Sequence, residues 1–364
     1  MLHYLLSLFN FLYYLLKNII GLFRFIAIYS PYYDLDDEND LNTKKHDLVT
    51  LPRYEIFKKE IEEPFYYTYR NKGKEIRKYL LQYAQFLIGS NSNAKYISED
   101  IEKLHNCSLI IDDIQDNSEL RRGRACAYRK FGMPLTLSSS YLIVFEVLNK
   151  ISLNYSNPLP HLQIIQEEIY NLHYGQSLDI YWKQQHIIPE IDDFIQMIDG
   201  KTGSVFRGLI RMCGIENNCN YLQDACQLFI HLARFFQIRD DYINITLPEY
   251  WKKKGFCEDF DERKISYLLV LNKTVTGETL EEFFNISEND KLSDRQKITL
   301  YSKLYNHNIL QKTYDILSDM KKNIYILEQK IRNPVSPSPY LKSFFQKLSY
   351  CPPISIDNLI KYLN

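Results

Sequence analysis

The stretch LHNCSLIIDDIQDNSELRRG, residues 104–123, decides how this 364-residue chain is interpreted. It starts as an apolar helical run and then carries three carboxylates, Asp112, Asp113 and Asp116. An α-helix turns once in about 3.6 residues, so positions 112 and 116 share a face and 113 lies about 100° around it. Such close carboxylates repel one another unless a cation lies between them, and oxygen ligands suit Mg²⁺. The stretch therefore predicts a helix that ends in a magnesium site.

A second cluster with the same spacing, Asp240, Asp241 and Asn244, closes another apolar run. One such cluster is a weak signal, because acidic helix faces exposed to water are common. Two clusters that each close an apolar helix are harder to explain by solvation alone. On facing helices of a bundle they would hold a metal-bound diphosphate from both sides. Arg121 and Arg122 follow the first cluster and supply guanidinium groups whose geometry matches phosphate oxygens.

The periodicity of apolar residues predicts an all-α fold. Apolar residues recur at i, i+3, i+4 and i+7 in Tyr79 to Leu87, Leu222 to Ile243 and Ile309 to Ile331. No segment sustains strict alternation, and 12 glycines with 13 prolines are few for a fold with many tight turns. Breaks between helices are expected at Gly89–Ser92, Asn154–Pro160, Pro189–Asp192, Asn217–Asn220 and Pro334–Pro339.

The overall composition excludes some partners. With 45% apolar and 24% charged residues the chain has enough apolar material for a large core. A net charge of −1 gives no general attraction to nucleic acid, so no nucleic-acid partner is expected. The seven cysteines are never spaced as C-x-x-C, which indicates reduced thiols in a cytoplasmic chain and no zinc site.

Three regions differ in composition. Residues 1–33 are apolar and aromatic, residues 34–50 form an acidic linker, and residues 51–364 form the helical domain. The longest uncharged run, Met1 to Leu16, is shorter than the roughly 20 residues that span a bilayer. We expect a membrane anchor or an in-plane amphipathic helix that tethers the protein to the cytosolic face of a membrane. A helix packed on the domain or on a partner chain, and a targeting piece or misassigned start, remain open.

The motifs resemble those of trans-prenyl diphosphate synthases, and the animal and fungal geranylgeranyl diphosphate synthases match best. The similarity runs from about Glu63 to Ser349, with the motifs in the order of the family. Asn244 agrees with the animal and fungal branch, which commonly has asparagine there. The motifs are GKEIR at 73–77, the first aspartate cluster, GQSLDIYW at 175–182, KTG at 201–203, QIRDD at 237–241 and FCED at 256–259.

The resemblance implies a large antiparallel helical bundle around a central cavity, the isoprenoid synthase fold, and the usual homodimer. It implies condensation of isopentenyl diphosphate with an allylic diphosphate, farnesyl diphosphate being the expected one, to geranylgeranyl diphosphate. Three Mg²⁺ ions are expected per site. By the same resemblance, Thr202 and Gln237 brace the developing cation. Lys74, Arg77, His105 and Arg122 match the metal-free isopentenyl diphosphate site, whereas Arg121, Lys201, Lys254 and Lys264 match the residues that steady the allylic diphosphate; Asp112, Asp113, Asp116, Asp240, Asp241 and Asn244 match the metal ligands.

Two details concern product length and closure of the site. Bulky aromatic residues at positions 107 and 108 would close the product tunnel at a short product, but these positions hold the small residues Cys107 and Ser108. This favours a C20 product. The end of the tunnel is then expected deeper, near Tyr141 and Phe145. Tight helix packing at small residues is the alternative explanation. After FCED, the glycine and the proline that are usual in the family are Arg263 and Leu268, so closure or diphosphate affinity is expected to differ, unless this change is benign.

Two other functions stay open. One is a terpene cyclase recruited from this scaffold, which needs metals but has no physical need for the second diphosphate pocket of Lys74, Arg77, His105 and Arg122. The other is a non-catalytic subunit that regulates an active synthase, although intact carboxylates near a core are costly to retain without use.

Overall fold

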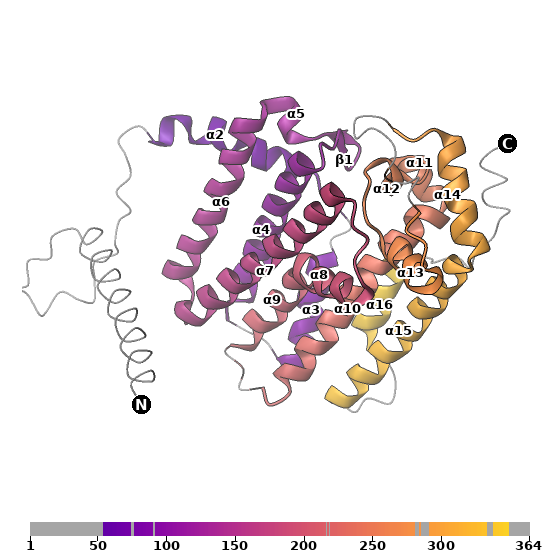
Figure 1. The fold of residues 1–364 in the computed structure, drawn as a ribbon. Coiled ribbons are helices and arrows are strands. Elements are labelled where there is room, and N and C mark those ends of the chain that lie inside the picture. The colour runs from indigo at the N-terminus through magenta and orange to yellow at the C-terminus, as the bar shows by residue number, and fades with distance from the viewer. Residues whose placement is uncertain are drawn as a thin grey trace, which may run out of the picture. The chain divides into compact units, whose positions relative to one another are not determined.

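The computed structural model describes residues 54–73, 76–89, 92–215, 217, 219–280, 284, 291–332 and 338–348, without the side chains of 54, 55, 253 and 254. One compact unit begins at Lys58. Figure 1 shows its helices, which confirm the all-α prediction. The elements are α2 (Tyr54–Tyr69), α3 (Ile76–Ile88), α4 (Ala94–Gln115), β1 (Leu120–Arg121), β2 (Arg124–Ala125), α5 (Ala127–Phe131), α6 (Met133–Asn154), α7 (Pro158–Gln185), α8 (Ile191–Lys201), α9 (Gly203–Gly214), α10 (Leu222–Thr246), α11 (Pro248–Lys254), α12 (Glu258–Asp261), α13 (Tyr267–Thr276), α14 (Asp294–Asn306), α15 (Ile309–Arg332) and α16 (Pro339–Lys347).

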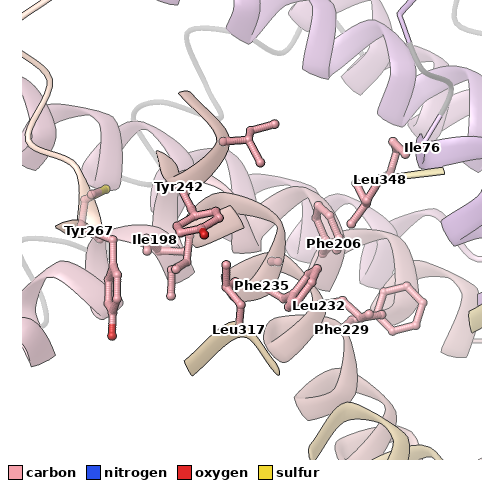
Figure 2. Close-up of a cluster of buried hydrophobic side chains, with 14 of the residues drawn as sticks. Ile76, Ile198, Phe206, Phe229, Leu232, Phe235, Tyr242, Tyr267, Leu317 and Leu348 are labelled. Carbon is pink, nitrogen blue, oxygen red and sulfur yellow. The ribbon is translucent and has the colours of Figure 1, made fainter. Parts of the chain in front are cut away.

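The three segments with the clearest helical periodicity form α3, α10 and α15, so these predictions are confirmed. Their apolar faces are buried in one core. Helix α10 lies at its centre and packs against α8, α9 and α15. Figure 2 shows part of this core, in which Phe229, Leu232 and Phe235 of α10 lie among side chains from other helices. Burial of aromatic side chains, which gives about 25 cal/mol per Å² of apolar surface, stabilises this arrangement.

A short hairpin that the sequence analysis did not predict follows α4. Strands β1 and β2 pair antiparallel, with Leu120 opposite Ala125 and Arg121 opposite Arg124. The two residues between them, Arg122 and Gly123, have φ values of 53° and 75°. Two positive φ angles make this a type I′ turn, the connection that matches the twist of two strands. The hairpin turns the chain back, and Arg121 thereby meets the end of α4.

Two glycines allow α7 and α8 to pack unusually closely. A Cβ atom on Gly175 would lie 2.4 Å from the backbone nitrogen of Lys201, and one on Gly200 would lie 2.8 Å from the carbonyl oxygen of Asn171. Any side chain at either position would therefore push the helices apart. The close approach explains why positions 175 and 200 are glycines. It also brings Gln176 and Asp179 of α7 near Lys201 at the end of α8.

No helix in the described part of the chain combines the length and the apolar character needed to cross a bilayer. The predicted anchor at 1–33 and the predicted linker at 34–50 lie outside the described residues, and so does the start of the predicted domain at 51.

Candidate active site

A cavity of about 1890 Å³ opens among α4, α7, α9 and α10. The hairpin and the segment 255–264 complete its walls. Most of the predicted site residues line it. These are Arg77, His105, Asp112, Asp116, Arg121, Arg122, Lys201, Thr202, Gln237, Asp240 and Lys264.

The first aspartate cluster is divided as its helical spacing predicts. Asp112 and Asp116 line the cavity, whereas Asp113 is buried beside the hairpin. Arg121 binds both neighbours: its Nε donates to Asp113 Oδ1 at 2.6 Å and its Nη2 donates to Asp112 Oδ2 at 3.1 Å. Gln176 Nε2 donates to Asp112 Oδ1 at 3.1 Å. The arginine thus holds the cluster in place and offsets part of its charge.

The pKa shifts of this cluster follow from burial and from its neighbours. Burial favours the neutral form of Asp112, but the charges of Lys201 and Arg121 outweigh it and lower the pKa of this carboxyl. For Asp116, burial and then the charge of Asp112 raise the pKa. Burial opposes the charge of Lys201, yet Asp179 and Asp112 raise its pKa above the usual value. The cluster therefore carries repulsion that a bound cation would relieve.

Lys201, Thr202 and Gln237 form a polar row across the cavity wall. Lys201 Nζ lies 2.6 Å from Asp179 Oδ2 and 3.7 Å from Asp112 Oδ1. The hydroxyl of Thr202 donates to Gln237 Oε1 at 2.9 Å, and Gln237 Nε2 donates to Asp241 Oδ1 at 3.0 Å. These bonds orient the oxygen atoms of Thr202 and Gln237 beside the cavity.

The second aspartate cluster differs from the first. Only Asp240 lines the cavity, where the Tyr250 hydroxyl lies 3.4 Å from its Oδ2. Asp241 is fully buried and accepts hydrogen bonds from Gln237 Nε2, from Lys264 Nζ at 2.8 Å and from the backbone N–H of Tyr267 at 2.9 Å. The carboxylate of Asp241 is thus used within the protein.

Asn244 is also engaged inside the protein. Its Nδ2 donates to Asp259 Oδ1 at 2.8 Å, and its Oδ1 accepts from the backbone N–H of Asp259 at 3.2 Å. Lys264 Nζ donates to the other carboxylate oxygen of Asp259 at 3.2 Å. This pairing ties α10 to α12 and places the Lys264 ammonium near Asp241.

The segment that departs from the family pattern has an unusual backbone. Arg263 has a φ of 55°, a left-handed conformation that costs a residue with a side chain about 1–2 kcal/mol. Its buried guanidinium donates to the carbonyl oxygen of Phe260 at 2.8 Å, at the end of α12. Leu268 is buried in α13. The arginine thus takes the place of a glycine at a position whose φ suits glycine.

The predicted metal-free site is a group of basic side chains. Arg77 Nε and Nη2 donate to the two carboxylate oxygens of Glu102 at 2.6 and 3.0 Å. Arg122 donates to the carbonyl oxygen of Asn71. Burial, and then the charges of Arg77 and Arg122, lower the pKa of His105 well below its usual value, so this imidazole is neutral at neutral pH.

Two predicted binding residues cannot be placed in this site. Lys74 lies outside the described residues, and only the backbone of Lys254 is described, at the end of α11. Their roles stay predictions.

Four acidic or amide residues contribute to the site but were not among the predicted site residues. Gln176 and Asp179 belong to the GQSLD motif, whose spacing gave a usable signal. Asp259 belongs to the FCED motif, which also gave a signal. Glu102 gave none, because its partner Arg77 follows only from the fold.

The carboxylates that line the cavity are the candidate metal ligands. In the described residues no three or more His, Cys, Asp or Glu side chains are grouped so that they hold an ion by themselves. Asp112, Asp116 and Asp240 nevertheless present only oxygen atoms to the cavity. Mg²⁺ in proteins typically binds one or two carboxylates and completes its coordination with water and substrate phosphates. The donor set therefore fits magnesium that arrives with a diphosphate.

The fold and the site together define a helical protein whose cavity combines carboxylates with basic side chains. A family model described as polyprenyl synthetase matches residues 58–304, and the chain belongs to this family. The family was predicted from the sequence, and it is confirmed.

Relatives and a solved structure agree with this family. A geranylgeranyl pyrophosphate synthase of Rhodocybe pseudopiperita is 31% identical over 301 residues, which cover 79% of this chain and 85% of that protein. Geranylgeranyl pyrophosphate synthase A of Phomopsis amygdali is 37% identical over 219 residues, 59% of this chain but only 56% of that protein. A crystal structure of a geranylgeranyl pyrophosphate synthase has a TM-score of 0.69 at 18% identity, covers 81% of this chain and 95% of that one, and confirms the fold.

Proposed function

We propose that the protein condenses isopentenyl diphosphate with an allylic diphosphate, preferably farnesyl diphosphate, to form geranylgeranyl diphosphate. The observation that carries this proposal is a single cavity with two kinds of anion site. One combines carboxylates with lysines, and the other consists of Arg77, His105 and Arg122. The condensation requires one diphosphate bound with metal and a second bound without metal. The two kinds of anion site match these two requirements.

The allylic diphosphate belongs on the carboxylate side. Asp112, Asp116 and Asp240 would hold Mg²⁺, which neutralises the charge of the leaving diphosphate. Lys201, Lys264 and Arg121 supply direct donors to the same group. The resemblance implies three ions per site, a number that calorimetric titration with Mg²⁺ and inorganic diphosphate measures.

The reaction needs a carbon–oxygen bond to break and a carbon–carbon bond to form. The C1–O bond of the allylic substrate breaks, and its electron pair leaves with diphosphate. The double bond of isopentenyl diphosphate then attacks C1, and the proton lost from the product passes to the released diphosphate. Thr202 and Gln237 line the cavity with oriented oxygen atoms that stabilise the positive charge on the allylic group.

The basic side chains of the second group favour elongation over cyclisation. Arg77, His105 and Arg122 line the cavity, and the carboxylate that faces Arg77 is that of Glu102. A cyclase binds one diphosphate and gains nothing from this group. Glu102 orients the guanidinium of Arg77 and is displaced or shared when a diphosphate binds.

A second copy of the chain is the proposed partner. Helices α6 and α7 pack together and expose aromatic side chains at helical spacing: Tyr141 and Phe145 on α6, Tyr170, Tyr174 and Tyr181 on α7. Exposed apolar patches of this kind mark interfaces. Light scattering should give twice 43.5 kDa. Phe145→Glu should give the monomer mass, whereas Ile326→Glu, an exposed position on α15, should still give the dimer mass. A dimer mass for both variants would contradict this interface.

Membrane attachment through residues 1–33 stays a proposal from the apolar composition of that segment. Fractionation of cells that express the full chain or a chain without residues 1–33 tests it. The full chain should sediment with membranes and the shortened chain should not. Equal distribution of the two would contradict the proposal.

One incubation tests the proposed activity. Purified protein, Mg²⁺ and farnesyl diphosphate are mixed with or without isopentenyl diphosphate, and the products are identified by mass. A C20 diphosphate that forms only with both substrates supports the proposal, and excess EDTA should abolish it. Hydrocarbons or alcohols from farnesyl diphosphate alone would instead indicate a cyclase. Absence of any turnover, with tight binding to an active synthase, would indicate a regulatory subunit.

A further inference from the structure

A smaller cavity of about 50 Å³ adjoins the large one. The two share wall residues, among them Ser108, Leu172, His173 and Val205, so one continues into the other. Beyond these shared residues the wall of the small cavity is mostly apolar. It includes Ile101, Leu104, Cys107, Val144, Ile165 and Ile169. Such a lining suits a hydrocarbon chain that extends from a diphosphate in the large cavity.

The expected floor residues do not line this extension. Tyr141 and Phe145 are 48% and 66% exposed on α6 and contribute to neither cavity. The expectation that they floor the tunnel in one chain is therefore wrong. Both side chains point to the outer face of α6, a direction that the sequence did not reveal.

A charged residue lies in this apolar wall instead. Glu168 of α7 is only 4% exposed. Its carboxylate accepts hydrogen bonds from Arg207 Nε at 2.8 Å and from Arg211 Nη1 at 2.6 Å, both on α9. A hydrocarbon group has no means to replace these bonds, and displacing the carboxylate would leave buried charges unpaired. The ion-paired Glu168 side chain is therefore a part of the cavity wall that a hydrocarbon chain does not displace.

Gly208 of α9 lies directly against this side chain. A Cβ atom at position 208 would lie 3.3 Å from Glu168 Cγ and 3.6 Å from its Cβ. Gly208 also lines the small cavity. Any larger side chain would therefore have to occupy the cavity or push Glu168 aside.

We propose that Gly208 and Glu168 set the length of the prenyl chain that this protein accommodates. Because Gly208 has no side chain, space for the prenyl chain remains beside it. Glu168, held by Arg207 and Arg211, forms the end of that space. The inference rests on the proposed function, because it assumes that a prenyl diphosphate occupies the large cavity.

The first test is the product spectrum of Gly208→Leu with geranyl diphosphate and isopentenyl diphosphate. The wild type should form mainly C20, whereas the variant should stop at C15, with the C20 to C15 ratio reduced at least tenfold. Gly208→Ala should fall between them. Thr299→Ala on α14, whose side chain is exposed and lines neither cavity, should leave the ratio unchanged. Unchanged C20 formation by Gly208→Leu would overturn the proposal.

A binding measurement separates this inference from the proposed activity. Calorimetry with Mg²⁺ and the thiolodiphosphate analogues of geranyl and geranylgeranyl diphosphate needs no turnover. Gly208→Leu should weaken the C20 analogue at least tenfold and leave the C10 analogue within twofold. Equal weakening of both analogues would overturn the inference even if the enzyme is active. A selective loss for C20 would support it even if condensation is absent. A thermal melt, with Gly208→Ala as the milder variant, shows whether the proteins are folded.

Discussion

The aspartate cluster at the end of α4 and the cluster in α10 have the same sequence spacing but different surroundings. In the first, Asp112 and Asp116 line the cavity and Asp113 is paired with Arg121. In the second, Asp240 alone lines the cavity, while Asp241 and Asn244 bind groups of the protein. Spacing on a helix thus determines which side chains share a face, but the neighbouring segments determine which of them stay available to a ligand.

The difference has a simple physical origin. The first cluster stands at a helix end, next to a hairpin that supplies one arginine. The second stands within α10, where the chain returns through α12 and the start of α13 and brings Asp259, Lys264 and Tyr267 against it. Those groups convert two of its three positions into links between helices. We therefore expect substitutions in the first cluster to affect catalysis and those at Asp241 and Asn244 to affect stability.

The largest effect is expected for Asp112→Asn. The change removes a negative ligand that faces the cavity, and we expect kcat/KM to fall about 10³-fold, the upper range for loss of one charge-stabilising group. The thermal midpoint should stay within a few degrees. Steady-state kinetics with a calorimetric melt measures both, and Asp319→Asn, at an exposed position on α15, is the control. Full activity of Asp112→Asn would contradict the metal mechanism.

Asp241→Ala should destabilise the fold. It leaves the backbone N–H of Tyr267 without its buried acceptor and leaves Lys264 with Asp259 as its remaining carboxylate partner, and loss of one partner of a buried ion pair costs about 3 kcal/mol. Urea unfolding should show this loss of unfolding free energy for Asp241→Ala and a far smaller loss for Asp116→Ala. Equal unfolding free energies for the two variants would remove the distinction between the clusters.

Asn244→Asp restores a third carboxylate to the second cluster. The new carboxylate would face Asp259 where the amide now donates at 2.8 Å. We expect a loss of about 1–3 kcal/mol on unfolding, because a buried hydrogen bond becomes a repulsion. No gain in Mg²⁺ affinity should follow. Tighter Mg²⁺ binding in calorimetry would show that position 244 faces the ligand after all.

The smallest effect concerns pH in the absence of metal. The raised pKa of Asp116 means that its charged form destabilises the folded state above that pKa. Asp116→Asn should therefore increase the unfolding free energy at pH 7.5 in EDTA. The gain should shrink as pH falls toward the usual value near 3.8, because wild-type Asp116 then becomes protonated. Asp112→Asn should show the opposite sign, since the pKa of Asp112 is lowered. A gain at pH 3.5, below the usual value, that equals the gain at pH 7.5 would contradict the assignment.

Part of this arrangement followed from the sequence. The 3.6-residue period gave α3, α10 and α15, and the same period separated Asp112 and Asp116 from Asp113. The engagement of Asp241 by Lys264, and of Asn244 by Asp259, did not follow, because these contacts depend on how α12 and α13 return to α10. The hairpin escaped detection because two-residue strands have no periodicity to recognise. The left-handed φ of Arg263 was also unforeseen, since an arginine gives no local signal for it.

The most direct test of this account is a crystal structure with Mn²⁺ in place of Mg²⁺ and the thiolodiphosphate analogue of farnesyl diphosphate. Anomalous scattering locates the ions without reference to activity. We predict ions bound by Asp112, Asp116 and Asp240, with Asp241 still paired with Lys264 and Asn244 with Asp259. Ions bound by Asp241 or Asn244, or a site without any ion beside Asp112, would contradict the account.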